Sequence, residues 1–132
     1  MYTIQDLSKE FNLNASALRY YEEAGLLTNV GRTKSGLRIY EESHRIRLNA
    51  ISCFKRTGLP ISKMLEFFNY EESLTDHIDE IRDMMIQHQD YLTGQIAGLT
   101  EDLKHIEKKV RYYTAIKNAL GNGLPFPDWE NV

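Results

Sequence analysis

The segment from residue 76 to residue 120 constrains the fold most, because its 45 residues contain no proline. Apolar side chains recur along it in steps of three and four residues, with one stutter between Leu92 and Ile96. A helix of this length extends about 68 Å at about 1.5 Å per residue. The pattern therefore predicts a coiled-coil helix that is too long to hide its apolar stripe against the rest of the chain.

This stripe needs a second helix to cover it, and the chain contains no other long helical segment. The most economical partner is a second copy of the same chain, so the sequence predicts a homodimer. The positions that we assign to dimerisation are Ile78, Ile81, Met85, Leu92, Ile96, Leu99, Leu103, Ile106, Val110 and Tyr113. The 71–75 segment is expected to be a linker before the helix, and residues 121–132 an apolar tail after it.

The two halves of the chain differ in charge. Residues 1–70 contain ten Lys or Arg and seven Asp or Glu, whereas residues 71–132 contain six and twelve. Phosphate groups would be repelled by the second half, so a nucleic acid should meet only the first half.

The first half begins with the pattern of a helix-turn-helix. Thr3 and Asp6 have the spacing of a capping box, which predicts a helix over 4–11. Asn14 is a good N-cap for a second helix that ends at Gly25. Two short helices joined by a three-residue turn indicate this DNA-binding motif.

The rest of the first half predicts a wing and two more helices. Residues 26–40 combine turn formers with a short alternating run and favour a β-hairpin. Helical periodicity returns over 41–57, where Ile46, Leu48, Ile51 and Phe54 are expected to face the core. Another short helix should follow Pro60. The fold class is therefore mainly α, with a winged helix-turn-helix head over residues 1–70 and a long dimerising helix over 76–120.

Polar and basic side chains gather on the second helix and the hairpin. A helix that enters the major groove needs short polar or guanidinium groups, and a wing needs cations and hydroxyls to hold phosphates. The candidate DNA contacts are Thr3, Ser16, Ala17, Arg19, Tyr20, Tyr21, Arg32, Lys34, Arg38 and Tyr40. The alternative interpretation is a solvated basic face with the tyrosines in the core.

Residues 1–70 resemble a MerR-type transcriptional regulator. The matching runs are YTI at 2–4, LRYYEEAGLL at 18–27, SGLRIY at 35–40 and GLPI at 58–61. The resemblance implies a homodimer with an antiparallel coiled coil. It also implies that this dimer binds a pseudo-palindromic promoter site and distorts the DNA for RNA polymerase. Arg19 with Tyr20 or Tyr21 matches the recognition-helix contacts of the family, and Arg38 with Tyr40 its wing contacts.

The resemblance also bears on the effector. Metal-sensing members carry cysteines near the end of the dimerisation helix, and drug-sensing members carry a large C-terminal domain, so neither class matches this chain. The short form resembles a branch that responds to aldehydes or other electrophiles through a cysteine in the helix after the wing. Cys53 lies in the matching region and is either this sensor or a small buried core residue. A small apolar ligand acting on a repressor is the remaining possibility.

Other classes of function fit the sequence poorly. A single cysteine excludes an internal disulfide and a cysteine-rich zinc site, and we expect neither a metal nor a cofactor. There is no glycine-rich phosphate loop or serine elbow, so an enzyme is not expected. No apolar run is long enough to span a membrane, which predicts a cytoplasmic protein. The competing class is a coiled-coil interaction module that binds protein instead of DNA.

Overall fold

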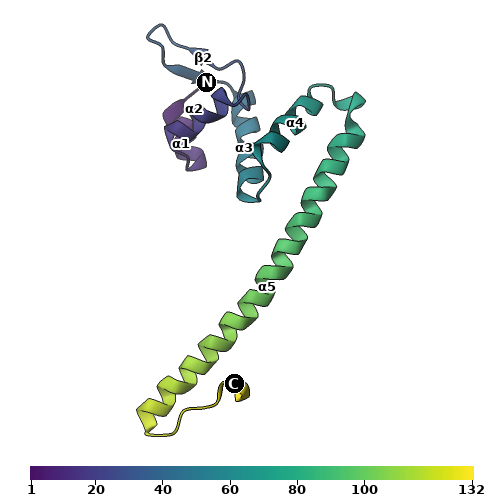
Figure 1. Ribbon diagram of the computed structural model, residues 1–132. Helices are drawn as coiled ribbons and strands as arrows, with labels where there is room; N and C mark the ends of the chain where they lie inside the picture. The colour runs from purple at the N-terminus through teal and green to yellow at the C-terminus, as the bar shows by residue number, and fades with distance from the viewer. The chain divides into compact units, whose positions relative to one another are not determined.

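The computed structural model describes residues 1–132 and divides into two compact units, Met1–His88 and Gln89–Val132. Figure 1 shows the helices and strands in chain order. The long helix α5 (Ile78–Asn122) contributes its beginning to the first unit and the rest to the second. It is one unbroken helix, as the spacing of its apolar residues predicted.

The first unit begins with two short helices whose N-termini are capped by their own sequence. Helix α1 (Ile4–Phe11) follows Thr3, and the Thr3 and Asp6 side chains each accept a backbone hydrogen bond from the other residue, at 3.0 and 2.8 Å. The predicted capping box is confirmed. Helix α2 (Ala15–Glu23) begins after Asn14, whose side chain accepts a bond from the first turn at 2.9 Å. The predicted helix-turn-helix is present.

A small antiparallel sheet carries the wing. Strands β2 (Gly31–Arg32) and β3 (Arg38–Tyr40) form the predicted hairpin, and Gly36 at its turn has a positive φ of 87°. Strand β1 (Tyr2–Thr3) pairs with the other side of β3, which gives the order β1-β3-β2. The sequence did not predict β1, because two residues are too short to show strand alternation and are held only by tertiary pairing.

Helices α3 (Glu42–Arg56) and α4 (Ile61–Glu71) follow the wing. Gly58, with a φ of 86°, ends α3 where a side chain would be strained, and Pro60 precedes α4. A short 3-10 helix η1 (Leu74–Asp76) then leads into α5.

The core of the first unit collects side chains from every helix. The fully buried members are Leu7, Leu18, Leu26, Leu27, Tyr40, Leu48, Ile51 and Met64. Beside them the Phe67 ring lies edge to face with Phe54 and Phe68, with ring centroids 5.1 and 5.4 Å apart. Ile81 of α5 is also buried in this core. Its assignment to the dimer seam is therefore corrected, because its own chain already covers it.

The outward face of α3 differs from the prediction. Ile46, expected in the core, is 64% exposed, and Cys53 is exposed as well. Each lies two residues from a buried position, and two residues turn a helix by about 200°. Cys53 is therefore not a buried core residue of the head.

The second unit contains the rest of α5 and the tail. Large apolar side chains of this part of α5 are 52 to 66% exposed, from Ile96 to Tyr113. Gly123, with a φ of 63°, follows the end of α5, and the tail turns back along the helix to a 3-10 helix η2 (Trp129–Asn131). No helix of the chain combines the length and the apolar character that crossing a membrane requires.

Candidate nucleic-acid interface

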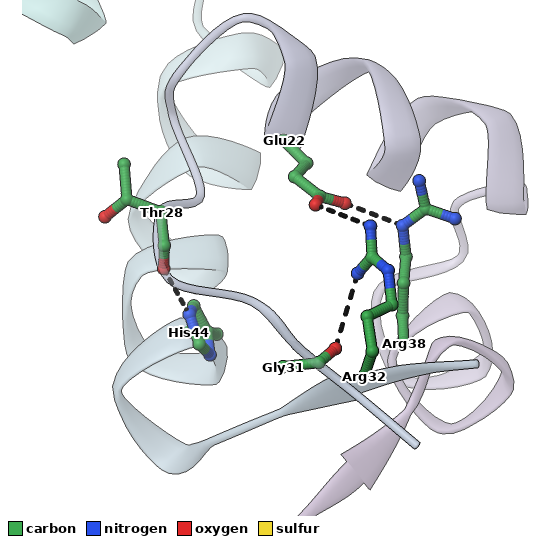
Figure 2. Close-up of polar contacts among 6 residues, drawn as sticks. All are labelled: Glu22, Thr28, Gly31, Arg32, Arg38 and His44. Carbon is green, nitrogen blue, oxygen red and sulfur yellow. Dashed lines mark hydrogen bonds and ion pairs between the residues drawn. The ribbon is translucent and has the colours of Figure 1, made fainter. Parts of the chain in front are cut away.

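The wing is tied to the second helix of the helix-turn-helix through one carboxylate. Glu22 of α2 accepts a hydrogen bond from Arg38 Nε at 2.6 Å and one from Arg32 Nη2 at 2.9 Å. Arg32 also donates to the Gly31 carbonyl at 3.3 Å. Figure 2 shows both guanidinium groups converging on the Glu22 side chain. We call Glu22, Arg32 and Arg38 the wing clamp.

The charges of the wing clamp stabilise one another. Burial raises the pKa of Glu22, but the hydrogen bonds from Arg38 and Arg32 outweigh it, so its pKa lies below the ordinary value. The hydrogen bond to Glu22 in turn raises the pKa of Arg38. The clamp therefore carries one net positive charge, and it fixes the wing cations beside α2.

A histidine holds the loop between α2 and the wing. The Nδ1 atom of His44 accepts the Glu41 N–H at 2.9 Å, so Nε2 carries the proton and donates to the Thr28 carbonyl at 2.6 Å (Figure 2). The His44 side chain is buried, with its ring edge against Tyr40. This bond joins the N-terminus of α3 to the loop that leads into the hairpin.

The exposed face of α2 carries three of the predicted contacts. Ser16 is exposed and its hydroxyl donates to the Asn14 side chain at 2.7 Å. Arg19 is exposed and forms no ion pair within the chain. Tyr20 is 51% exposed. Because Arg19 precedes Glu22 by three residues, it lies on the same side of α2 as the wing clamp.

The turn of the wing presents one more cation. Thr33 closes this turn: its N–H donates to the Leu37 carbonyl at 2.7 Å and its hydroxyl accepts the Leu37 N–H at 3.0 Å. Lys34 follows Thr33, is exposed, and forms no ion pair within the chain. The wing thus offers Lys34 at its tip and the clamped guanidinium groups at its base.

The remaining predicted contacts are placed differently. Tyr21 and Tyr40 are buried in the core with their hydroxyl groups enclosed, so neither reaches a phosphate as predicted, and both assignments are corrected. Tyr21 follows the buried Leu18 by three residues and so shares its face of α2, and Tyr40 ends β3 in the core, where its ring lies edge-on to His44. Ala17 is half-buried, and the Thr3 hydroxyl is used in capping α1.

Sequence reasoning missed the central residue of this surface. Glu22 was read only as part of a motif, because an acidic side chain has no direct use against phosphate. The signal in the sequence was a pair of arginines, Arg32 and Arg38, on the predicted hairpin and a carboxylate on the helix before it. These groups can pair only when the hairpin folds back onto that helix. No three His, Cys, Asp or Glu side chains gather closely enough to hold a metal ion.

Cys53 has a defined neighbourhood on α3. The Thr57 hydroxyl donates to the Cys53 carbonyl at 2.8 Å and contacts Nε2 of His88 at the same distance. The His88 ring also lies edge-on to Phe54 at 6.3 Å. The C-terminal end of α3 is therefore hydrogen-bonded to α5 one turn after the exposed thiol.

Comparison with known proteins gives consistent matches. The family model described as MerR HTH family regulatory protein matches residues 2–70. An uncharacterized HTH-type transcriptional regulator of Haemophilus influenzae is 30% identical over 121 residues, which is 92% of this chain and 89% of that protein. The HTH-type transcriptional regulator AdhR of Bacillus subtilis is 39% identical over 64 residues, 48% of this chain and 46% of its own.

A solved structure is similar over nearly the whole chain. It is the crystal structure of HiNmlR, a MerR family regulator lacking the sensor domain, bound to promoter DNA. It has a TM-score of 0.82 and 30% sequence identity, and the match covers 91% of this chain and 90% of that one.

Proposed function

Because the chain belongs to the MerR family and is a DNA-binding transcriptional regulator of that type, we propose that it binds a pseudo-palindromic promoter site as a homodimer. In this proposal each head occupies one half-site and the dimer distorts the DNA between them for RNA polymerase. HiNmlR, which is similar over 91% of this chain, is bound to promoter DNA, and this supports the choice of ligand.

The observation that carries the proposal is the juxtaposition of the exposed face of α2 with a clamped wing. Ser16, Arg19 and Tyr20 project from α2 without burial, and Glu22 on the same side holds the wing arginines. A guanidinium group that is free of an internal partner, as in Arg19, suits a base edge or a phosphate in the major groove. The clamped arginines and Lys34 suit the flanking backbone.

Binding to the cognate promoter, measured by fluorescence anisotropy with a scrambled duplex as the control, tests this function. The cognate site should bind at least about a thousandfold more tightly, as specific sites do. Affinity for both duplexes should fall with rising salt as counterions are released. Equal affinity for the two duplexes would contradict sequence-specific binding, and the absence of salt-sensitive binding to either duplex would favour a protein-interaction module.

The charges of α5 support an antiparallel dimer. Within α5, residues 78–90 contain four Asp or Glu and one Arg, whereas residues 104–117 contain five Lys or Arg and one Glu. Parallel copies would align like charges, and antiparallel copies align opposite ones. The residues proposed for the seam are the exposed apolar ones, Ile78, Ile96, Leu99, Leu103, Ile106, Val110 and Tyr113, together with the partly covered Met85 and Leu92.

We further propose that Cys53 senses an aldehyde. Its thiol is exposed, so a small electrophile has access to it without opening the core. The sulfur of the thiolate adds to the carbonyl carbon, the C=O π bond opens as the C–S bond forms, and the oxygen takes up a proton from water to give a hemithioacetal. This addition requires no oxidant. An open cleft of about 500 Å³ on the same unit is lined mainly by charged and polar side chains, among them Glu10, Arg45 and Arg56, with Phe11 and Ile46 as its apolar members, and this lining favours a polar ligand over an apolar one.

The route from Cys53 to the dimer helix is the hydrogen-bonded pair Thr57 and His88. Thr57 bonds to the carbonyl of the modified residue, and His88 belongs to α5. An adduct that shifts the last turn of α3 changes this hydrogen bond. It therefore changes how the head packs against the first turns of α5. Coupling energies of roughly 1–3 kcal/mol are ordinary for such effects.

Transcription from the cognate promoter with and without an aldehyde tests the sensor. Cys53→Ser should keep promoter binding and lose the response, whereas Ser52→Ala, a neighbouring change without a thiol, should keep both. A full response in Cys53→Ser would contradict the sensor and leave a small ligand acting on a repressor. The length of the promoter spacer at the bound site distinguishes activation from repression.

A further inference from the structure

One residue of opposite sign stands in each charged segment of α5. Arg82 is the only Lys or Arg between residues 71 and 103, and Glu107 is the only Asp or Glu between residues 103 and 127. Both side chains are exposed. Neither forms an ion pair within the chain, although Lys104 and Arg111 stand at helix-neighbour spacing from Glu107. Lys104 pairs with Glu101 instead, at 3.0 Å.

Both residues hold the same place beside the apolar stripe. Arg82 follows Ile78 by four residues and precedes Met85 by three, and Glu107 stands in the same way between Leu103 and Val110. They therefore lie on the same flank of the seam. In an antiparallel pair related by a two-fold axis, residues on the same flank face each other.

The spacing of the stripe brings these two positions to the same level. An antiparallel pair centred on the stripe sets Ile78 opposite Tyr113, Met85 opposite Ile106 and Leu92 opposite Leu99. Arg82 lies between the first two of these layers, and so does Glu107 on the other helix. A slip of one heptad in either direction would set Arg82 opposite Thr100 or Thr114 instead.

The structure leaves the flank of Arg82 open. On the other flank, Met84 packs against the core of the head and His77 stacks on Tyr70, with ring centroids 4.9 Å apart. Arg82 instead lies one turn from two exposed apolar residues, Ile78 at 52% and Ile86 at 36%. The head thus covers one side of the start of α5 and leaves the side of Arg82 for a second helix.

We propose that Arg82 of one copy pairs with the partner's Glu107, twice in each dimer, and that this pair selects the antiparallel register. The inference rests on the proposed homodimer and names the side chains that choose its alignment. In an antiparallel pair of copies each Arg82 faces the partner's Glu107, so both charges are paired. In a parallel pair neither residue faces its counterpart.

The test mixes two charge-reversal variants and counts the dimers by native mass spectrometry. In each homodimer of Arg82→Glu or of Glu107→Arg, both pairs become repulsive, and each should dissociate roughly tenfold more readily than wild type. The mixed dimer restores both pairs, so its share should rise from the statistical half to about nine-tenths. The enrichment should shrink at high salt.

A matched control makes the same exchange on the outer faces of the helices. Asp79→Lys and Arg111→Asp are exposed positions at nearly the same level, and their mixture should stay statistical. Enrichment in the control as well, or in neither mixture, overturns the specific pair. A monomeric wild type overturns the homodimer and the pair with it, and dimeric wild type with unaffected variants overturns the pair alone.

Discussion

The head and the second half of α5 both carry apolar side chains at helical spacing, but these side chains are buried in the head and exposed on α5. In the head, residues such as Leu18 and Leu48 are completely covered by their own chain. Beyond His88, residues such as Leu99 and Leu103 keep more than half of their surface in water, at 66% and 57% exposed. The head therefore contains what it needs to fold, whereas the helix contains half of an interface.

This difference separates two kinds of stability. A core closed within one chain has a free energy of unfolding that does not depend on protein concentration. A seam closed by a second copy gains stability with concentration, because association is bimolecular. Substitutions in the head and in the seam should differ in how much stability they remove, and also in whether that loss depends on protein concentration.

The largest expected effect comes from a charge in the seam. Leu99→Asp places two carboxylates without polar partners in each dimer, and we expect the dimer dissociation constant to rise by roughly two orders of magnitude or more. Promoter binding should be lost with it, because one head has too few contacts. Sedimentation velocity measures the first effect and anisotropy the second.

The control for this variant is Ala97→Asp, which adds the same charge on an exposed position about 200° around the helix. It should remain dimeric. A Leu99→Asp monomer that still binds the promoter tightly would show that a single head is sufficient for binding. Closure of the seam would then not be required for DNA recognition.

The next effect distinguishes the two kinds of stability directly. Leu48→Ala should lower the free energy of unfolding of the head by about 2–5 kcal/mol, because it leaves a cavity in a closed core. Urea denaturation should give the same loss at every protein concentration. Leu103→Ala should instead show a loss that changes with concentration, and equal behaviour of the two variants would argue against an open seam.

A smaller effect is expected within the DNA-binding surface. Arg19→Ala should weaken binding to the cognate site by about 1–3 kcal/mol and reduce the preference over a scrambled site. Lys34→Ala should weaken both sites alike and lower the salt dependence, because it removes a phosphate contact. Lys104→Ala, in the second unit, provides the control. An unchanged sequence preference in Arg19→Ala would contradict its assignment to base recognition.

The smallest effect concerns the wing clamp and its pH dependence. The pKa of folded Glu22 lies below its ordinary value of 4.5, so the clamp's contribution is complete above that pH and is lost as the pH falls through the lower folded value. We expect Glu22→Gln to cost less than about 1 kcal/mol at neutral pH, since the pair is partly exposed.

Thermal denaturation between neutral pH and pH 3 measures this difference. The gap between wild type and Glu22→Gln should narrow below pH 4.5. A gap that widens on acidification would mean that the Glu22 carboxylate is not stabilised by the arginines.

Local signals in the sequence predicted most of the head. The Thr3 and Asp6 capping box, the Asn14 cap and the stop at Gly58 act within a few residues, so their outcome does not depend on distant parts of the chain. Strand β1 depends on β3, which lies more than thirty residues away, and two residues carry no pattern that would announce it.

The sequence predicted which segments form the candidate site better than it predicted what each side chain does there. Tyr20 and Tyr21 are adjacent, and only the rotation of about 100° between neighbours places one outside and the other in the core. Counting from Leu18 would have separated them. The wing arginines were predicted as DNA contacts, but their pairing with Glu22 depends on how the hairpin folds back onto α2, which the linear sequence does not specify.

The folded-back tail contains a fluorescent side chain, Trp129, whose emission reports on the position of the tail. Trp129 is the only tryptophan of the chain, and its ring packs edge-on to Tyr112 at 5.2 Å with the Lys108 ammonium 4.5 Å from its centroid. Intrinsic emission excited in the indole band therefore arises from this one place. A solution of the unlabelled protein should thus register release of the tail as a change in emission wavelength, while rearrangements confined to the head stay spectrally silent.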